Sequence, residues 1–189
     1  MNKDILHNPK AGDLLISEPF LQDENFVRSV VLLCEHSEEG SFGLIMNKPS
    51  ILKLGELVEA LDFLDKEVFV GGPVEQNTLH FIYVGENGLE GSISLGENIW
   101  WGGDYDALVE KLKLGLLDHD SVRFFLGYSG WGSGQLDDEL ADETWIICRD
   151  KLNEQTFNLT PEELWKSLLK NMGGEFKVIA NYPLDPRLN

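Results

Sequence analysis

Seven short apolar segments constrain the fold of this chain more than any other feature of its sequence. Each is only three to seven residues long and is rich in β-branched or aromatic residues, as buried strands are. A turn-rich stretch joins the second to the third and suits a hairpin, whereas longer connections require crossovers. The pattern predicts a mixed or antiparallel sheet built from Leu14–Ile16, Ser29–Cys34, Phe42–Met46, Val68–Val70, Thr78–Val84, Val122–Gly127 and Trp145–Cys148.

Three further stretches show the spacing of helices. Apolar residues recur every three or four positions over Leu54–Leu64 and over Tyr105–Leu114, which is typical of amphipathic helices. A third helix is predicted to begin at Thr160, with Pro161 in its first turn and Glu163 completing a capping box. Strands and helices are thus mixed along the chain, and the fold class is α+β.

The charge balance limits the partners of the chain. It has 15 Lys and Arg against 33 Asp and Glu, a net charge of −18. Residues 67–110 and 124–148 contain no Lys or Arg at all. Nucleic acids and anionic lipid surfaces both require a positively charged protein surface. We therefore expect no direct nucleic-acid binding and no membrane association, and we expect a protein partner that is itself basic.

The sequence also indicates a compartment. The N-terminal segment Met1–Gly12 lacks the apolar core of a signal peptide, and no apolar run approaches the roughly 18 residues of a membrane span. Cys34 and Cys148 lie within apolar segments and are expected to be reduced, buried thiols. A cytoplasmic location is the prediction, and the oligomeric state stays open.

The densest run of glycine covers residues 127–135, between an apolar strand and a helical segment. A nucleophile elbow requires Gly-x-Ser-x-Gly, and Trp131 occupies the place of the second glycine. A phosphate loop requires a lysine, and the run contains none. The acids that follow, Asp137 to Glu139, already complement the positive end of the next helix and are interpreted as its solvated start.

Two interpretations of this glycine-rich run stay open. In the first it is a structural loop, with Trp131 filling the core. In the second a small-molecule or hydrolytic site lies beneath Tyr128–Gln135, with Ser129, Gln135 and His36 as polar contacts.

Other candidate sites are less developed. Cys34 and His36 are too few to close a metal site, so neither a metal nor a cofactor is expected. Trp100 and Trp101 are adjacent on a predicted strand and point to opposite faces, so one of them is a candidate anchor for a protein partner. No catalytic residue is predicted, and the candidate binding or motif residues are His36, Asn47, Gly71, Gly72, Pro73, Tyr128, Ser129, Gly130, Trp131, Gly134, Gln135 and Glu139.

Three motifs, in this order along the chain, resemble the bacterial AlgH/YqgE family. The first joins residues 12–19 to Glu35-His36 and Asn47-Lys48-Pro49, and the second is Val70-Gly71-Gly72-Pro73-Val74. The third runs from Phe124 to Leu136 and continues with Glu139 and Trp145. Pro186 and Asn189 also match the usual ending of the family.

The resemblance implies one α+β domain over residues 1–189, with a bifurcated sheet curled into a pseudo-barrel and helices around it. It implies no catalytic residues and no cofactor, and the family is described as regulating the transcription of alginate genes. We therefore expect a non-catalytic regulatory or protein-binding module that acts on transcription only indirectly. A small-molecule site beneath the glycine-rich run is the alternative.

Overall fold

A computed structural model describes residues 8–150 and 152–183 of the chain. Two sequence-based expectations lie partly or wholly outside these ranges. They concern the family-like ending at Pro186 and Asn189, and residues 1–7 of the N-terminal segment that lacks the features of a signal peptide. Ten strands form one connected sheet: β1 (Leu14–Ser17), β2 (Val30–Ser37), β3 (Gly40–Ile45), β4 (Pro49–Lys53), β5 (Glu67–Val70), β6 (Val74–Val84), β7 (Ile93–Gly96), β8 (Ile99–Trp101), β9 (Val122–Gly132) and β10 (Trp145–Cys148).

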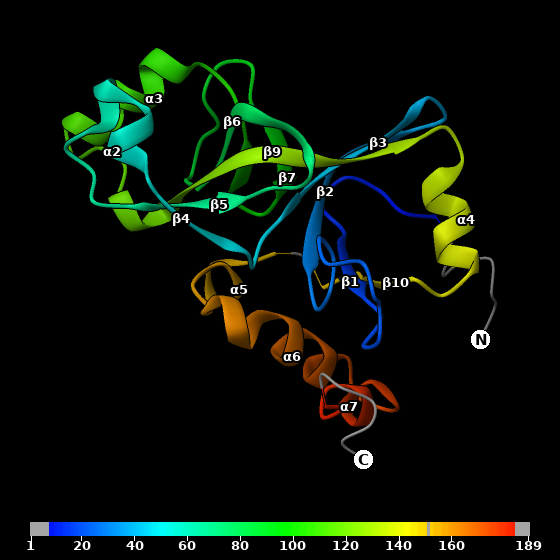
Figure 1. Cartoon of the computed structure of the whole chain (residues 1–189). Helices are drawn as coiled ribbons and strands as arrows, with labels where there is room; N and C mark the ends of the chain where they lie inside the picture. Colours follow the sequence, from blue (N-terminus) through cyan, green and yellow to red (C-terminus); the bar gives the residue numbers. More distant parts are fainter. Residues whose placement is uncertain (1–7, 151, 184–189) are drawn as a thin grey trace.

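The sheet divides at β9, its central strand. The main path runs β10-β1-β2-β3-β9-β6-β8-β7, and β5 also pairs with β9 while β4 pairs with β5. The β5–β9 pairing is parallel and the other described pairings are antiparallel. In Figure 1 one branch, which contains β5 to β8, is curled, and the other branch extends through β3 toward β1 and β10. The predicted bifurcated α+β fold is confirmed, and the sheet is not closed.

All seven predicted strands are present, as β1, β2, β3, β5, β6, β9 and β10, with one important difference in extent. The predicted strand Trp145–Cys148 matches β10, and the predicted hairpin is formed by β2 and β3. The run of glycines was predicted to be a loop, but β9 continues through it to Gly132. Glycine is tolerated there because β9 is paired with β3, which supplies its backbone hydrogen bonds. The pairing runs from Gly43 opposite Ser129 to Gly40 opposite Gly132.

The helices lie around the two branches of the sheet. The described residues contain α2 (Leu54–Leu57), α3 (Tyr105–Lys113), α4 (Gln135–Ala141), α5 (Glu154–Phe157), α6 (Pro161–Met172) and α7 (Phe176–Ile179), with 3-10 turns η1 (Glu59–Leu61) and η2 (His119–Ser121).

Two helix predictions were partly wrong. A continuous helix over Leu54–Leu64 does not form, because Val58 adopts an extended conformation and separates α2 from η1. The predicted helix at Thr160 is α6, but its capping box is incomplete. The Thr160 hydroxyl donates to the Glu163 carboxylate at 2.8 Å instead of accepting a backbone N–H.

Three apolar clusters fill the spaces between these layers. The first lies between the long branch and α5 to α7 and includes both Cys34 and Cys148, which are buried free thiols as predicted. The second lies inside the curled branch against α3, and the third lies beneath α4. Trp100 packs on the second cluster and Trp101 on the first, so they do point to opposite faces.

Candidate functional site

Residues 71–73 connect β5 to β6 and cross over β9. Strands β5 and β6 pair with the same residues of β9 and must therefore lie along its opposite edges. A Cβ on Gly71 would lie 2.2 Å from the Gly127 carbonyl oxygen, and one on Gly72 would lie 2.2 Å from the Tyr128 carbonyl. The two glycines are required because crossing backbones leave no room for a side chain.

Ser129 secures this crossing and has no access to a substrate. Its side chain is 0% exposed, and its hydroxyl donates to the Gly71 carbonyl at 3.1 Å. The same carbonyl accepts the backbone N–H of Ile45 at 2.9 Å. A nucleophile must be reachable by its substrate, so the hydrolytic alternative has no support at Ser129.

Glu139 is not a solvated helix residue, as its position in an acidic run suggested. Its carboxylate accepts the indole N–H of Trp131 at 2.8 Å and that of Trp145 at 2.6 Å. Its other oxygen accepts the Gln135 amide at 2.8 Å, and the Gln135 oxygen accepts the backbone N–H of Gly132 at 3.0 Å. These bonds fix α4 against the end of β9, and the buried Trp131 fills the core as predicted.

We expect Glu139→Ala to lower the free energy of unfolding by about 2 kcal/mol, because it leaves two half-enclosed indole N–H groups without an acceptor. Urea unfolding followed by tryptophan fluorescence measures this. The matched control is Asp138→Ala, one residue earlier on the exposed side of α4, for which a change below about 0.5 kcal/mol is expected. Equal losses in the two variants would contradict the role assigned to Glu139.

The remaining predicted residues also support the fold. The Asn47 side chain accepts the N–H of Val30 at 2.9 Å and donates to the Arg28 carbonyl at 2.9 Å, which links β2 to the chain after β3. His36 bonds to the Ser41 hydroxyl across the β2–β3 hairpin at 2.7 Å. Gly134 precedes α4 in a left-handed conformation, and Pro73 is exposed beside the crossing.

Four rings form what we call the aromatic platform: Phe42, His80, Trp101 and Tyr128. Phe42 stacks on Trp101 at 4.8 Å and on Tyr128 at 4.6 Å between ring centroids. His80 stands edge-on to both Phe42 and Tyr128, at 5.2 and 6.0 Å. All four side chains are partly exposed. The platform includes Tyr128 from the predicted motif residues and Trp101 from the pair of tryptophans predicted to contain an anchor for a partner.

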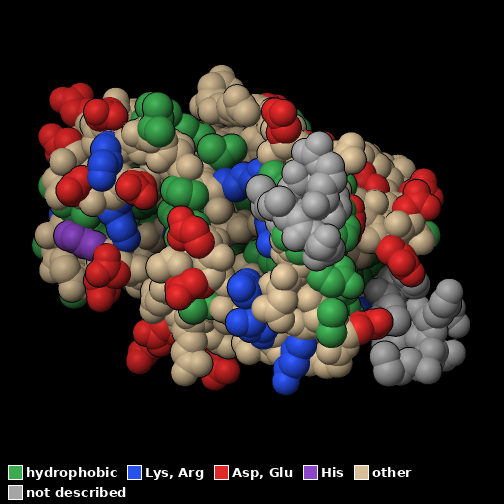
Figure 2. All heavy atoms as spheres, turned by 60° about the horizontal axis from the view of Figure 1, so that its bottom comes forward, with side chains coloured by type: hydrophobic (Ala, Val, Ile, Leu, Met, Phe, Trp, Pro, Cys, Tyr) green, Lys and Arg blue, Asp and Glu red, His purple; other side chains and the backbone are tan. Residues whose placement is uncertain are grey.

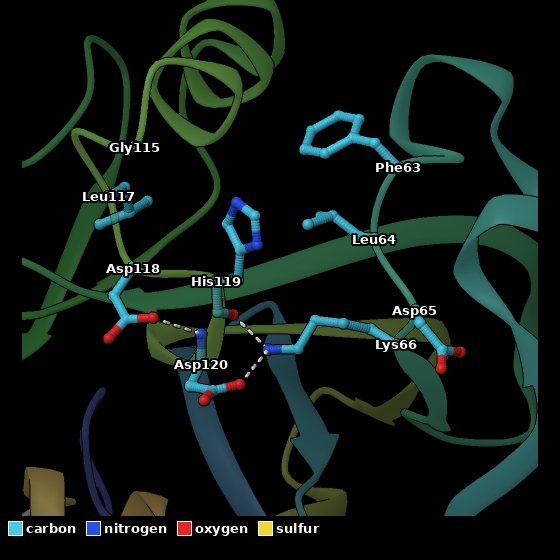
Figure 3. A pocket seen from close by; sticks show the side chains of 9 residues that line it. All are labelled: Phe63, Leu64, Asp65, Lys66, Gly115, Leu117, Asp118, His119 and Asp120. Atoms are coloured by element: carbon cyan, nitrogen blue, oxygen red, sulfur yellow. Dashed lines mark hydrogen bonds and ion pairs between the residues drawn. The ribbon is translucent and has the colours of Figure 1, made fainter.

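A separate hollow of about 680 Å³ lies between the segments 63–66 and 115–120. Figure 3 shows Phe63 and Leu64 on one side of it and Leu117 on the other, with the His119 ring standing between them. The Phe63 and His119 rings meet edge to face at 5.8 Å. The His119 Nε2–H donates to the Leu112 carbonyl at 3.1 Å, which orients the ring.

Lys66 is the one lysine or arginine that lines this hollow, and its ammonium group is bound inward. It donates to the carbonyls of His119 and Val122, the latter at 2.9 Å, and lies 3.7 Å from the Asp120 carboxylate (Figure 3). Burial lowers the pKa of Lys66. With Asp65 and Asp118 also at the rim, the hollow presents carboxylates and apolar groups to a ligand.

Exposed apolar side chains lie on the segments that form the hollow. Leu114 and Leu116 flank its Gly115 in the chain and are 64% and 71% exposed, and Phe63 is 41% exposed. Large apolar side chains clustered at the surface of a soluble protein mark contact sites. The sequence did not predict this hollow because Leu114 is placed as expected for the end of an amphipathic helix. The available signal was the pair of leucines on either side of Gly115.

The glycine-rich run lines neither this hollow nor a second, smaller one that the described residues form. A second hollow, of about 350 Å³, is lined by Asn47 and Gly72 among others, and neither hollow contains a residue of Tyr128–Gln135. Within residues 8–150 and 152–183, no group of three or more potential ligands is placed to hold a metal ion, and no helix is long and apolar enough to cross a membrane. In Figure 2, acidic side chains are spread over the visible face, with basic ones in small groups among them.

Comparisons with known proteins agree with this fold. Two solved structures resemble it: a protein from Corynebacterium diphtheriae, with a TM-score of 0.78, 20% identity and 93% of each chain covered, and the solution structure of AlgH from Pseudomonas aeruginosa. The latter has a TM-score of 0.69 and 28% identity, and the match covers 93% of this chain and 96% of AlgH. The first likeness shows the fold alone.

Sequence relatives cover nearly the whole chain. A UPF0301 protein from Cytophaga hutchinsonii is 45% identical over 179 residues, which are 94% of this chain and 98% of that protein. One from Chlorobium limicola is 37% identical over 95% of this chain and 96% of its own length. A family model described as DUF179, AlgH-like, matches residues 14–177. By this match and by these relatives, the chain belongs to the AlgH-like family.

Proposed function

We propose that this protein is a non-catalytic binding module that engages a basic protein partner through the hollow between segments 63–66 and 115–120. The observation that carries this proposal is the composition of that surface. The concave site is lined by the exposed Phe63 and by carboxylates, its lysine is bound inward, and two exposed leucines flank its Gly115 in the chain. Any effect on transcription would then run through the partner.

Two polar groups of the family motifs are committed to bonds within the fold, which supports a role without catalysis. Ser129 is enclosed and bonded to a backbone carbonyl, and the Glu139 carboxylate is occupied by three donors. Residues committed to such bonds hold the chain in place and are not free to transfer protons. Ser129 and Glu139 are therefore explained by the fold, and the contact with the basic partner is assigned to the hollow.

Charge complementarity indicates the kind of partner. Asp65, Asp118 and Asp120 line the hollow together with Lys66, while Lys53 pairs with Asp65 at 3.2 Å and Lys113 lies 5.8 Å from the Phe63 ring. The chain as a whole carries a net charge of −18. Such a surface attracts a cationic protein from a distance, and the apolar centre holds it on contact. A segment of the partner with leucine-like side chains beside Lys or Arg matches both properties.

Affinity capture with the full chain tests the proposal. The wild type, the double variant Leu114→Ser with Leu116→Ser, and the control Val178→Ser are immobilised and exposed to host lysate. Val178 is 59% exposed on α7, remote in sequence from the hollow, so the control removes a comparable apolar group. The retained protein is then produced separately and titrated against each variant.

We expect the double variant to weaken this binding by about tenfold or more, because two buried leucine contacts are lost. Val178→Ser should leave the affinity unchanged, and raising the salt concentration should weaken it. A partner that binds all three forms equally would overturn the proposal. So would a lysate in which no salt-sensitive partner is retained.

A further inference from the structure

We infer that the aromatic platform is a second binding site, which takes the guanidinium group of an arginine side chain on an extended peptide segment. Its rings come from four strands, β3, β6, β8 and β9, that only the divided sheet brings together. The inference does not rest on the hollow described above, which is built from other elements.

The shape of the platform comes from glycines beside the rings. Gly130 lies directly opposite Phe42 in the β3–β9 pairing, and Gly132 lies opposite Gly40 two residues further on. A Cβ on Gly130 would come within 3.1 Å of the Tyr128 ring. The exposed Gly130 and Gly132 therefore leave a bare strip of backbone along which a peptide can lie against the rings.

The stacking order limits what binds the rings. Phe42 lies between Trp101 and Tyr128, with interplanar angles of 28° and 27°, so its two faces are covered by these neighbours. Trp101 and Tyr128 pack on the first apolar cluster and are partly exposed, so a ligand would reach the parts of these two rings that face neither Phe42 nor the core. Aromatic faces carry negative electrostatic potential, and an arginine guanidinium stacks on them more readily than an ammonium group does.

Two exposed carboxylates stand beside the platform. Glu35 is exposed and pairs with Phe42 across β2 and β3, which places the two side chains on one face of the sheet. Glu75 is exposed and close enough to His80 to act on its ionisation. Strands β3, β6 and β8 contain no Lys or Arg, and Arg123 of β9 is bonded to the carbonyls of Met46 and Phe157. A cation is therefore the favoured ligand.

His80 itself supplies no competing positive charge. Its Nε2–H donates to the Thr78 hydroxyl at 3.1 Å, since that hydroxyl already donates to the Glu75 carbonyl at 2.8 Å. Burial lowers the pKa of His80, and Glu75 partly offsets this. The ring thus stays neutral near pH 7 and its edge supports the stacked rings.

Two peptides test the inference on the full chain by nuclear magnetic resonance. The probe is acetyl-Gly-Arg-Gly-Arg-Gly-amide, and its matched control replaces each arginine with citrulline, which keeps the shape and removes the charge. The arginine peptide should shift the signals of Phe42, Tyr128 and Gly130 and bind about tenfold more tightly than the citrulline peptide. Equal binding of the two peptides, or shifts confined to other surfaces, would overturn the inference.

Two substitutions make the assignment specific. Tyr128→Leu removes an aromatic face and should abolish the preference for arginine. Glu35→Gln changes an exposed side chain and cannot act through misfolding, and it should weaken the arginine peptide about threefold. Its control, Glu110→Gln on α3, removes the same charge elsewhere and should have no effect. If Glu35→Gln and Glu110→Gln behave alike, a general attraction to the acidic surface replaces the proposed site.

Discussion

Gly71→Ala is expected to destabilise the protein by more than about 4 kcal/mol and to abolish cooperative folding. The added methyl group would lie 2.2 Å from the Gly127 carbonyl oxygen and 2.9 Å from a methyl carbon of Leu44. The first neighbour is backbone held in β9, so it cannot move away without breaking the sheet. Gly71 also bonds β9 through its own N–H, to Leu126 at 2.8 Å.

Another glycine of the family motifs, Gly132, provides a matched control for this prediction. Gly132→Ala adds the same methyl group at the far end of β9, where the nearest atom is a Gln135 side-chain oxygen at 3.9 Å. We expect a change in unfolding free energy below about 0.5 kcal/mol. Circular dichroism and urea unfolding of both variants measure the difference. A folded Gly71→Ala protein of near wild-type stability would show that the crossing is more open than described.

The strands and the α6 helix were predictable because their signals are local. Trp145–Cys148 is a short apolar run and forms β10, and Pro161 begins α6 in the position where its missing N–H costs nothing. The Leu54–Leu64 prediction failed although its spacing was helical. There the Leu54 N–H bonds to the carbonyl of Lys66, so the chain folds back on itself after one turn. Tertiary pairing overrides a short local preference.

The candidate sites were harder to predict because they join distant parts of the chain. Gly71 and Gly72 were predicted as candidate binding or motif residues, whereas the structure shows that they are needed because they cross a strand more than fifty residues later in the chain. Glu139 appeared to be one of many surface acids until Trp131 and Trp145 were placed on either side of it. The hollow, too, is formed only because segments 63–66 and 115–120 lie next to each other in the folded chain. No spacing rule along one segment contains such information.

Arg123 joins three parts of the fold without a carboxylate partner in any bond that the structure describes. Its guanidinium donates to the carbonyl of Met46 at 3.0 Å and to that of Phe157 at 2.6 Å. It also lies over the rings of Phe69 and Phe157, at 4.6 and 4.7 Å from their centroids. Burial lowers the pKa of Arg123 to about 10, so it keeps its charge at neutral pH.

Because this one side chain connects β9 to α5 and to the end of β3, we expect Arg123→Ala to lower the free energy of unfolding by about 3 kcal/mol. Two carbonyls would lose their donor and two rings would lose their cation. The control is Lys113→Ala, an exposed cation 5.8 Å from the Phe63 ring, which should cost less than about 0.5 kcal/mol. Arg123→Lys should fall between the wild type and alanine, since an ammonium group cannot reach both carbonyls while stacking on two rings. Should urea unfolding give Arg123→Lys the same stability as the wild type, positive charge alone would account for the role of Arg123, and the planar stacking would contribute nothing.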